Sequence, residues 1–399
     1  MSVPAVSIII PCFNSSKTIT DTLNSVLMQT LQGWEALVIN DGSTDSSLER
    51  IKSFCQKDPR IKLISQKNQG VAEARNSGIK MAQGEYIIFL DADDLLFPRM
   101  LDRTVRMLRK NTDCGVAYCD WITSDYNLVN MIWTNSFIGK RNPYSDLVEQ
   151  NRFQPNVLLI RRNVVDELGG FDVTLPPCED WDMWIRIARQ GVGFIRVPEA
   201  LALYRMTPGS MSRKVSKGLK GGLAVIERGF APDPRVKNPD PEFAKGSDPS
   251  RKNDALFNWS LQCCASALTG GEEEMATTIF DEAIARYRKD PTPAQVLRPM
   301  KWALWFGGGT LIGDWSVFSQ RFGLPLIRFL LKVESRLERP GFAMEFLNQF
   351  MPRTQKLGGQ QIMRLLLDRA MAKYFDREKD RRAKRMRDEF ISALRSASP

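Results

Sequence analysis

The sequence predicts an α/β protein in which helices on both faces cover a mostly parallel sheet, followed by a mainly helical C-terminal region. Between residue 6 and about residue 120, short apolar runs rich in β-branched and aromatic residues alternate with amphipathic runs of helical period. Acidic residues directly follow two of the apolar runs, as they do at the ligand-binding edge of such sheets. At 399 residues the chain also exceeds the usual length of one compact core, which indicates two domains.

Helices are expected between the apolar runs. Residues 19–27 carry apolar side chains at i, i+4, i+7 and i+8, Ser46 and Glu49 have the spacing of a capping box, and Pro98 opens a further helix. The expected strands are residues 6–10, 34–39, 61–64, 86–90 and 116–118.

Composition divides the chain into three parts. We expect a first domain over residues 1–212, with a turn at GGFD, residues 169–172, and a helix at 181–189. Residues 213–252 are rich in Gly, Pro, Ser and Lys, which favours a linker. Residues 253–399 have helical patterns and form a C-terminal region whose role these patterns do not define.

The residue types that are missing restrict the chemistry. The chain has no histidine, which excludes Ser-His-Asp and Cys-His catalysis and zinc sites that use imidazole. Any general base is therefore a carboxylate, Lys, Tyr or Cys. The seven cysteines include no C-x-x-C pair and are odd in number, so neither a zinc ribbon nor a secreted disulfide framework fits. A bound metal is then expected to have oxygen ligands, which points to Mg²⁺ or Mn²⁺.

Charge and hydropathy indicate where the protein works. The net charge of +10 favours partners that carry phosphate, such as nucleotides, nucleic acid or an anionic membrane. The start, MSVPAVSIIIPCF, reads as a core strand and not as a signal peptide, and no stretch reaches the roughly 18 apolar residues of a membrane span. We therefore expect a cytoplasmic protein. Trp302, Trp305 and Trp315 suit either a core or peripheral contact with the inner face of the membrane, and the basic run at 376–390 suits contact with a membrane or a partner.

The run FLDADD, residues 89–94, is the strongest local signal for a site. It places three carboxylates directly after an apolar strand, where they repel one another unless a cation or solvent neutralises them. Asp91 and Asp93 are two positions apart, so they project to the same side while the chain is extended. Alternatively, Asp93 or Asp94 caps the helix that Pro98 opens.

A second polar cluster, NDGSTDSS, ends another strand at residues 40–47. Asp41 and Asp91 then lie at the carboxyl ends of two strands, which in a parallel sheet face one crevice. A carboxylate at Asp41 can accept the imide N–H of a pyrimidine or a ribose hydroxyl. Asp45 and Ser46 have the spacing of plain N-cap residues.

Two further stretches carry candidate residues. In NQGVAEARNSG, Gly70 permits a tight turn and Arg75 has a planar fork of donors suited to a diphosphate, unless Arg75 is a surface residue paired with Glu73 or Asp91.

In CEDWDMWIRIA, Asp180 stands before a helix and is a cap, a general base, or both. Indole surface beside a carboxylate raises its proton affinity, which suits a base. Trp184 is expected in the core. Trp181 lies either in the core or on the acceptor side, against a sugar ring.

Taken in order, SIIIPCFN, NDGSTD, NQGVAEARNSG, FLDADD, GGFD and EDWDMWIR resemble the family 2 glycosyltransferases, which are inverting enzymes of the Rossmann-like GT-A fold. The resemblance covers about residues 5–212. Each motif is weak alone, but six in the family's order and spacing are specific.

The resemblance implies roles on the side of the nucleotide-sugar donor. Pro11 and Phe13 match the loop that lies against the nucleotide base. Asp41 matches the carboxylate that binds base or ribose, Arg75 the arginine that faces base and diphosphate, and Asp91 the first acid of the family's D-x-D motif, near the ribose.

The resemblance also implies the metal and acceptor sides. Asp93 matches the second acid of D-x-D, on the Mn²⁺ or Mg²⁺ ion that bridges the diphosphate. Asp180 matches the catalytic base, and Glu179 its neighbour on the acceptor side. The segment 204–213 resembles the one that closes over the donor, but the histidine that many relatives have near Thr207 is missing. Either water or diphosphate oxygens then complete the metal shell, or the metal binds more weakly than in the rest of the family.

The function implied is inverting transfer of a sugar to a hydroxyl on a glycan or lipid-linked acceptor, in polysaccharide or glycolipid synthesis, without nucleic acid as a partner. One alternative is a degenerate, non-catalytic module that binds nucleotide or glycan. The other is a nucleotidyltransferase, which normally has a glycine- and lysine-rich loop after the first strand, whereas PCFNSSK has no glycine.

Overall fold

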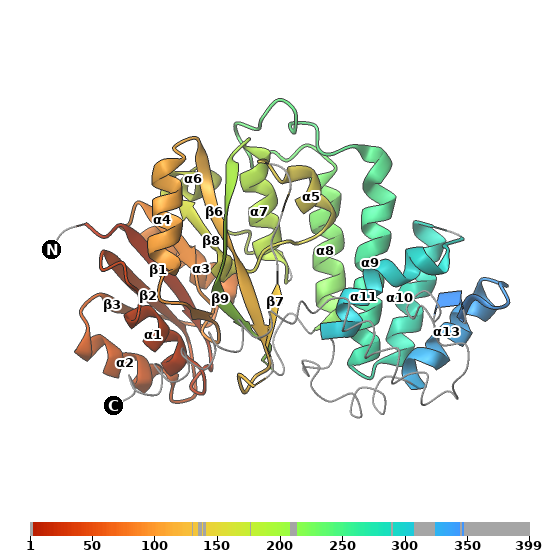
Figure 1. The fold of residues 1–399 in the computed structure, drawn as a ribbon, viewed down its shortest axis with the longest axis horizontal. Helices are drawn as coiled ribbons and strands as arrows, with labels where there is room; N and C mark the ends of the chain where they lie inside the picture. Colours follow the sequence, from red (N-terminus) through yellow and green to blue (C-terminus); the bar gives the residue numbers. More distant parts are fainter. Residues whose placement is uncertain are drawn as a thin grey trace.

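A computed structural model of the chain describes residues 3–346, apart from residues 130, 135–137, 139–140, 176, 208–213, 289, 307–323 and 344. Figure 1 shows a sheet flanked by helices, with further helices packed at one end. Several predictions lie outside the described residues: those on Trp315, on the basic run 376–390 and on most of the segment 204–213, as well as those on the side chains of Trp302 and Trp305.

The first half of the sheet is parallel. Its strands are β1 (Val6–Cys12), β2 (Trp34–Asp41), β3 (Ile61–Gln66) and β4 (Tyr86–Phe89), in the order β3-β2-β1-β4. β1, β2 and β4 are buried along their whole length, as expected of continuous apolar strands covered on both faces. The strands predicted in this half are confirmed.

The second half of the sheet is mixed, so the expectation of a mostly parallel sheet holds only for the first four strands. β8 (Leu158–Arg161) lies antiparallel between β4 and β6 (Cys114–Ser124). β9 (Gly193–Arg205) runs parallel to β6, whereas β5 (Leu95–Leu96) and β7 (Met131–Thr134) are short antiparallel additions. β8 comes from the irregular stretch after residue 120, where periodicity gives no strand direction.

Helices cover this sheet. α7 begins at Glu179, two residues before the predicted start, so Asp180 lies inside its first turn and not before it. α4 begins at Met100, and no acidic side chain caps it, so Asp93 and Asp94 are not its caps. The helices are α1 (Ile19–Leu27), α2 (Ser47–Lys57), α3 (Val71–Met81), α4 (Met100–Lys110), α5 (Tyr144–Glu149), α6 (Arg162–Leu168) and α7 (Glu179–Arg189).

The start of α2 differs from the predicted capping box. Ser46 is the N-cap residue, but its side chain makes no capping hydrogen bond. Instead Asp45 Oδ1 accepts the N–H of Ser47 at 3.0 Å, and Asp45 Oδ2 accepts the N–H of Ser16 at 3.0 Å. The aspartate therefore stabilises the helix start and also ties it to the loop after β1.

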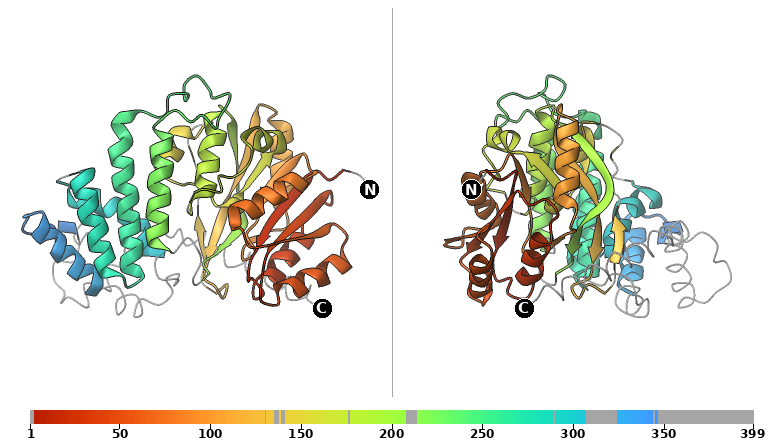
Figure 2. Two further views of the ribbon diagram at one scale, coloured as in Figure 1. Left: turned by 180° about the vertical axis from the view of Figure 1, so that it is seen from behind. Right: turned by 60° about the vertical axis from the view of Figure 1, so that its left-hand side comes forward.

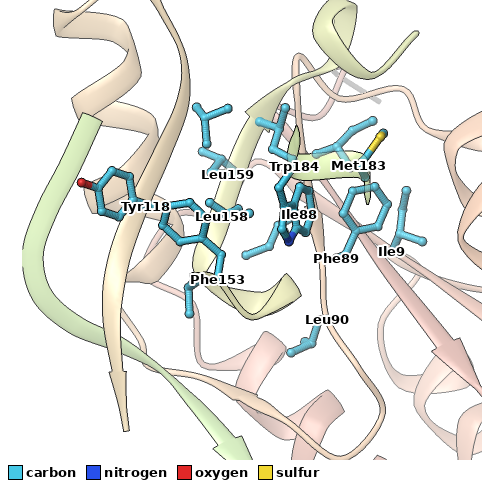
Figure 3. Packing of buried hydrophobic residues seen from close by; sticks show 14 of the residues in the cluster. Ile9, Ile88, Phe89, Leu90, Tyr118, Phe153, Leu158, Leu159, Met183 and Trp184 are labelled. Atoms are coloured by element: carbon cyan, nitrogen blue, oxygen red, sulfur yellow. The ribbon is translucent and has the colours of Figure 1, made fainter. Parts of the chain in front are cut away.

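Aromatic side chains join α7 to the sheet (Figure 3). Trp184 is completely buried, which confirms it as a core residue, and its ring centroid lies 6.4 Å from that of Phe89 on β4. Phe171, from the GGFD turn, meets Phe89 edge-on at 4.8 Å. Contacts of this kind fix the position of α7 relative to the strand that leads into the acidic run.

The helices that follow extend the molecule at one end (Figures 1 and 2). α9 to α13 enclose a second core that includes Phe257, Phe280 and Phe329. None of the described helices combines the length and the apolar character needed to cross a membrane. The bounds are α8 (Val215–Gly229), α9 (Lys252–Thr269), α10 (Glu273–Arg286), α11 (Pro293–Phe306) and α13 (Leu324–Arg336).

The range expected to be a linker, 213–252, contains α8. Val225, Ile226 and Phe230 are buried in the first core, together with residues of the sheet. The described part of this range is therefore packed and not extended. Where the functional boundaries between domains lie stays a prediction.

Candidate active site

The turn after β2 is built around Gly42. Its φ is +74°, and a Cβ atom there would lie 2.8 Å from the backbone nitrogen of Asn68. Only glycine fits such a position without moving the neighbouring loop. The backbone of residues 40–44 can therefore pass close to the loop after β3, and Asp41 faces that loop.

Asp41 organises the loop after β3. Its side chain is 3% exposed, and its Oδ1 accepts the side-chain amide of Gln66 at 2.8 Å and the N–H of Gln69 at 2.9 Å. Oδ2 accepts the N–H of Gly70 at 2.9 Å. A carboxylate has about four lone-pair positions, so roughly one stays free for a ligand.

The loop after β1 is tied to the loop after β2. Asn14 Oδ1 accepts the N–H of Thr44 at 2.8 Å, and the N–H of Ser15 donates to Ser47 Oγ at 2.8 Å. Phe13 leaves this loop with 49% of its side chain exposed, so its ring is accessible, whereas Pro11 is buried in β1. Of the two residues predicted to lie against the base, Phe13 therefore has an accessible ring and Pro11 does not.

The three acids after β4 have three different surroundings. Asp94 is buried, and its Oδ1 accepts the N–H of Arg205 at 2.9 Å, while Oδ2 has no hydrogen-bond partner among the described residues. Burial, followed by the charges of Asp93 and Asp91, raises the pKa of Asp94 well above its usual value. Burial and the charge of Asp91 also raise the pKa of Asp93, whereas the nearby hydroxyl of Thr207 lowers it in part. Asp91 is more open and is paired with Arg75.

Arg75 is a buried residue, so the alternative of a surface arginine is wrong. Its side chain is 3% exposed, with Nη2 2.7 Å from Asp91 Oδ1 and Nη1 2.6 Å from Glu179 Oε1. Its guanidinium also lies over the ring of Phe171, 5.3 Å from the centroid. Burial alone would lower the pKa of Arg75, but the charges of Asp91, Glu179 and Asp180 raise it overall. Arg75 is thus a charged bridge between the acids after β4 and those that begin α7.

Asp180 has a pKa close to neutral pH, so it can take up and release a proton there. Burial, followed by the charge of Glu179, raises the pKa of Asp180 to about 7, although the charge of Arg75 lowers it. The charge of Asp91 also contributes to the rise, so the two acidic clusters are near enough to influence each other. One oxygen, Oδ1, accepts the N–H of Trp181 at 2.7 Å.

Of the two positions expected for Trp181, the one on the acceptor side is wrong and the one in the core is confirmed. Its side chain is completely buried, its Nε1 donates to the carbonyl of Leu147 at 2.6 Å, and its ring centroid lies 5.0 Å from that of Trp259 on α9. The indole has no free face for a sugar ring because the C-terminal helices cover it. Glu179, the other residue assigned to the acceptor side, is buried against Arg75.

The other candidate nucleophiles and bases are weaker. All seven cysteines are free, and burial raises the pKa of each thiol above its usual value, so none is a thiolate near neutral pH. In the part of the chain that the structure describes, no group of three or more His, Cys, Asp or Glu side chains has the arrangement of a metal site.

Asn151 is a site residue that the sequence did not reveal. Its side-chain Oδ1 accepts the N–H of Phe153 at 3.2 Å, which turns its Nδ2 toward Asp180 Oδ2, 3.4 Å away. It comes from an irregular stretch where no motif or period marks it. Three residues that form ion pairs beside the start of α7 had readable signals: Asp172 ends the GGFD turn, and Asp182 and Arg186 have the i, i+4 spacing of a helical ion pair.

The chain is similar in sequence to known proteins. The sequence model described as Glycosyl transferase family 2 matches residues 7–169. The Escherichia coli UDP-Glc:alpha-D-GlcNAc-diphosphoundecaprenol beta-1,3-glucosyltransferase WfgD is 30% identical over 228 residues, which is 55% of this chain and 85% of WfgD. Two uncharacterized glycosyltransferases of Haemophilus influenzae are 31% and 35% identical, and the matched parts cover 51% and 41% of this chain and just under two thirds of their own length, 66% and 65%.

A solved structure supports the same fold. Residues 1–349 of Staphylococcus aureus TarS, crystallised with UDP-GlcNAc, superpose with a TM-score of 0.51 at 16% identity, over 89% of this chain and 95% of that one. This likeness confirms the expected GT-A type of fold. The match to WfgD and the match of the family model over residues 7–169 lead to one conclusion: the chain belongs to glycosyl transferase family 2.

Proposed function

We propose that the chain transfers a sugar from a nucleoside-diphosphate donor to a hydroxyl group, with inversion at the anomeric carbon. One observation carries this proposal: Arg75 contacts both Asp91 and Glu179, the latter 104 positions away in the sequence. The acids that follow β4 and the acids that begin α7 thus belong to one site, as a reaction with a leaving group on one side and a base on the other requires.

The donor would lie along the carboxyl ends of β1, β2 and β4. The accessible ring of Phe13 can stack on a base, with Pro11 shaping the strand end behind it. Asp41 would accept one hydrogen bond from base or ribose with the lone pair that its three protein donors leave free. Asp91 would accept from the ribose, and Arg75 would act on the diphosphate through its positive charge.

The acids after β4 fit a hard divalent cation. Loss of solvent and the nearby carboxylates raise the pKa of both Asp93 and Asp94, and one oxygen of the buried Asp94 has no partner among the described residues. An oxygen-only donor set with few protein ligands suits Mg²⁺ or Mn²⁺ shared with a diphosphate. Asp93 would hold such an ion, which when bound supplies positive charge for the departing diphosphate.

Asp180 would be the general base. As the acceptor oxygen forms its bond to the anomeric carbon, the bond from that carbon to the diphosphate breaks, and the acceptor proton moves to a carboxylate oxygen of Asp180. A carboxylate with a pKa of about 7 is a stronger base than an ordinary aspartate and is still largely ionised at slightly alkaline pH. Glu179, whose charge is neutralised by Arg75, would help to shape the acceptor side of the site beside Asp180.

The names of relatives suggest the donor and the acceptor. WfgD is a UDP-glucose enzyme that acts on a diphosphoundecaprenol-linked sugar, and TarS was crystallised with UDP-GlcNAc. We infer a UDP-sugar donor and a lipid-linked or polysaccharide acceptor for this chain. Peripheral contact of the C-terminal region with the cytoplasmic face of a membrane would bring it to such an acceptor.

An assay of nucleotide-sugar turnover tests the function. Purified protein would be incubated with UDP-, GDP- and dTDP-sugars and Mn²⁺ or Mg²⁺, with and without undecaprenyl-diphosphate-linked sugars, and the release of free nucleoside diphosphate measured. We expect release that requires both an acceptor and a metal ion. Tight nucleotide binding without turnover of any donor would favour the non-catalytic binding module.

A further inference from the structure

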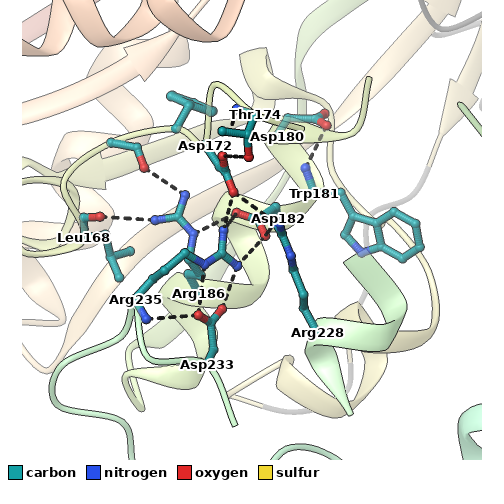
Figure 4. Close-up of polar contacts among 12 residues, drawn as sticks. Leu168, Asp172, Thr174, Asp180, Trp181, Asp182, Arg186, Arg228, Asp233 and Arg235 are labelled. Atoms are coloured by element: carbon teal, nitrogen blue, oxygen red, sulfur yellow. Dashed lines mark hydrogen bonds and ion pairs between the residues drawn. The ribbon is translucent and has the colours of Figure 1, made fainter. Parts of the chain in front are cut away.

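A cluster of alternating charges supports the first turns of α7, next to the acids of the site (Figure 4). Its members come from the GGFD turn, from α7, from the end of α8 and from the segment after α8. The three acidic and three basic side chains balance in charge. They are Asp172, Asp182, Asp233, Arg186, Arg228 and Arg235.

Arg235 is at the centre of this cluster because it contacts all three carboxylates. Its Nη2 lies 2.8 Å from Asp182 Oδ1, its Nη1 lies 2.8 Å from Asp172 Oδ2, and its Nε and Nη2 lie 2.9 and 2.7 Å from the oxygens of Asp233. Asp182 is buried in the first turn of α7, two residues after Asp180. Without Arg235 this buried carboxylate would keep, among the described residues, only its ion pair with Arg186 and one longer contact, 3.4 Å, to Arg228.

The start of α7 needs such support because its backbone is strained. Cys178, just before the helix, has a φ of +115°, which is unfavourable for a residue other than glycine. Two hydrogen bonds hold it: the N–H of Asp182 donates to its carbonyl at 3.0 Å, and its own N–H donates to Glu179 Oε2 at 3.2 Å. Asp182 and Glu179 therefore hold this turn. Their own carboxylates are in turn held by ion pairs with arginine side chains.

The segment after α8 is bound to α7 by further contacts. Arg189 of α7 donates to the carbonyl groups of Ala231 at 2.7 Å and Arg228 at 2.9 Å. Arg235 adds the link to the first turn of the helix. Both ends of α7 are thus attached to a segment that composition alone had marked as a linker.

From these contacts we propose that Arg235 is a positioning residue for Asp180. The inference rests on the proposed function, in which Asp180 is the base. By pairing with Asp182 and Asp172 at once, Arg235 fixes the rotation and height of the first turn of α7, and so the direction in which the Asp180 carboxylate points. Small displacements of a catalytic group are costly, since a misplacement of about 1 Å can reduce a rate by about 10²-fold.

Arg60 provides a closely matched control. Like Arg235 it follows an aspartate by two positions, and its N–H, Nε and Nη2 bind that residue, Asp58, in the same pattern. The two arginine side chains are 31% and 30% exposed. Arg60 lies just before β3, at the end of the sheet opposite the site, and its guanidinium stacks on Trp34. Among the described residues, Arg60 makes no hydrogen bond or ion pair with α7.

The test compares R235M, R235K and R60M in the full-length chain. Nucleoside-diphosphate binding by calorimetry, kcat and KM with a turned-over donor, and amide exchange of residues 178–183 by mass spectrometry would be measured for each. We expect R235M to lose about 10- to 100-fold in kcat with donor affinity within about twofold of wild type. R235K, which keeps the charge but not the fork, should recover part of the loss. R60M should keep the wild-type kcat, and only R235M should show faster exchange at the start of α7.

Two outcomes would overturn the inference. One is an R235M protein with the kcat and the exchange of R60M. The other is an R235M protein in which donor affinity falls as much as kcat, because that indicates general loosening and not misplacement of one group. If R235M does not fold, R235K carries the same comparison. If wild type turns over no donor, the proposed function fails, while the exchange of residues 178–183 still decides whether Arg235 holds α7.

Discussion

The guanidinium of Arg75 lies 2.6 Å from the carboxylate of Glu179, although the two residues are 104 positions apart in the sequence. Its other terminal nitrogen lies 2.7 Å from Asp91. One buried cation thus neutralises an acid on the proposed donor side and an acid on the proposed acceptor side. The two halves of the site are therefore coupled both in geometry and in charge.

Replacing Arg75 by Met should affect both stability and the pH dependence of catalysis. Removing one partner of a buried ion pair costs about 3–5 kcal/mol because it leaves an uncompensated charge, so we expect a clear loss of unfolding free energy in urea. The charge of Arg75 lowers the pKa of Asp180, so the remaining activity should need a higher pH. R75M combined with E179Q should recover part of the lost stability, because one unpaired charge is removed; no recovery would contradict the coupling.

Replacing Asp180 by Asn should nearly stop transfer. The amide cannot accept the acceptor proton, and loss of a general base usually reduces a rate by a factor on the order of 10² to 10⁴. Donor binding should stay the same, because the proposed function places Asp180 on the acceptor side of Arg75. Steady-state kinetics and calorimetric titration with the nucleoside diphosphate measure the two effects.

The control for this change is Asp102→Asn, which breaks an exposed ion pair with Arg106 on α4. It should leave both quantities as in wild type. A D180N protein with more than about a tenth of the wild-type kcat would show that Asp180 is not the base.

The rate should rise with pH through the pKa of Asp180. The ionised carboxylate is the active form, and burial together with the charge of Glu179 raises its pKa to about 7. Below pH 7 the protonated form dominates, so kcat/KM should fall about tenfold for each further unit of acidification, and it should level off above about pH 8. A profile that stays flat down to pH 5 would mean that Asp180 has an ordinary pKa or does not act in the rate-limiting step.

Replacing Asp93 by Ala should remove the effect of metal ions on donor binding. If Asp93 holds the cation, the affinity of the wild type for a nucleoside diphosphate should rise on addition of Mn²⁺ and that of D93A should not. Binding in the absence of metal should be equal or slightly stronger in D93A, because one negative charge near the diphosphate is gone. Titrations with Mn²⁺ and with EDTA measure this, and an unchanged metal effect in D93A would place the ion elsewhere.

Much of the first half of the fold could be predicted from the sequence. β1, β2 and β4 are buried on both faces, so their apolar runs are continuous and easily recognised, and the polar residues after them mark the site edge. Asp41 and Asp91 were predicted because they follow such strands, and Asp180 because of its place at the start of a helix and the family resemblance. The antiparallel direction of β8 could not be predicted, because the stretch before it has no period that gives direction.

Contacts between distant segments could not be predicted from the sequence. Trp181 is next to the proposed base in sequence, but the packing of Trp259 from α9 against it decides its surroundings. Residues 213–252 have the composition of a linker, yet Arg235 and the carbonyl groups near it bind α7. Neither relation leaves a local pattern, since each is a contact between segments that are far apart in the sequence.

The central claim is that one nucleoside diphosphate binds between Asp41 and Asp93 with Asp180 across from it. A crystal structure of the full chain with UDP and Mn²⁺ tests this most directly. The account predicts the base against Phe13 and Asp41, the ribose at Asp91, the metal on Asp93, and an open space between the diphosphate and Asp180. Nucleotide bound elsewhere, for example in the groove of about 370 Å³ lined by Asn76, Lys80 and Arg162, with the edge at Asp41 and Asp93 empty, would contradict it.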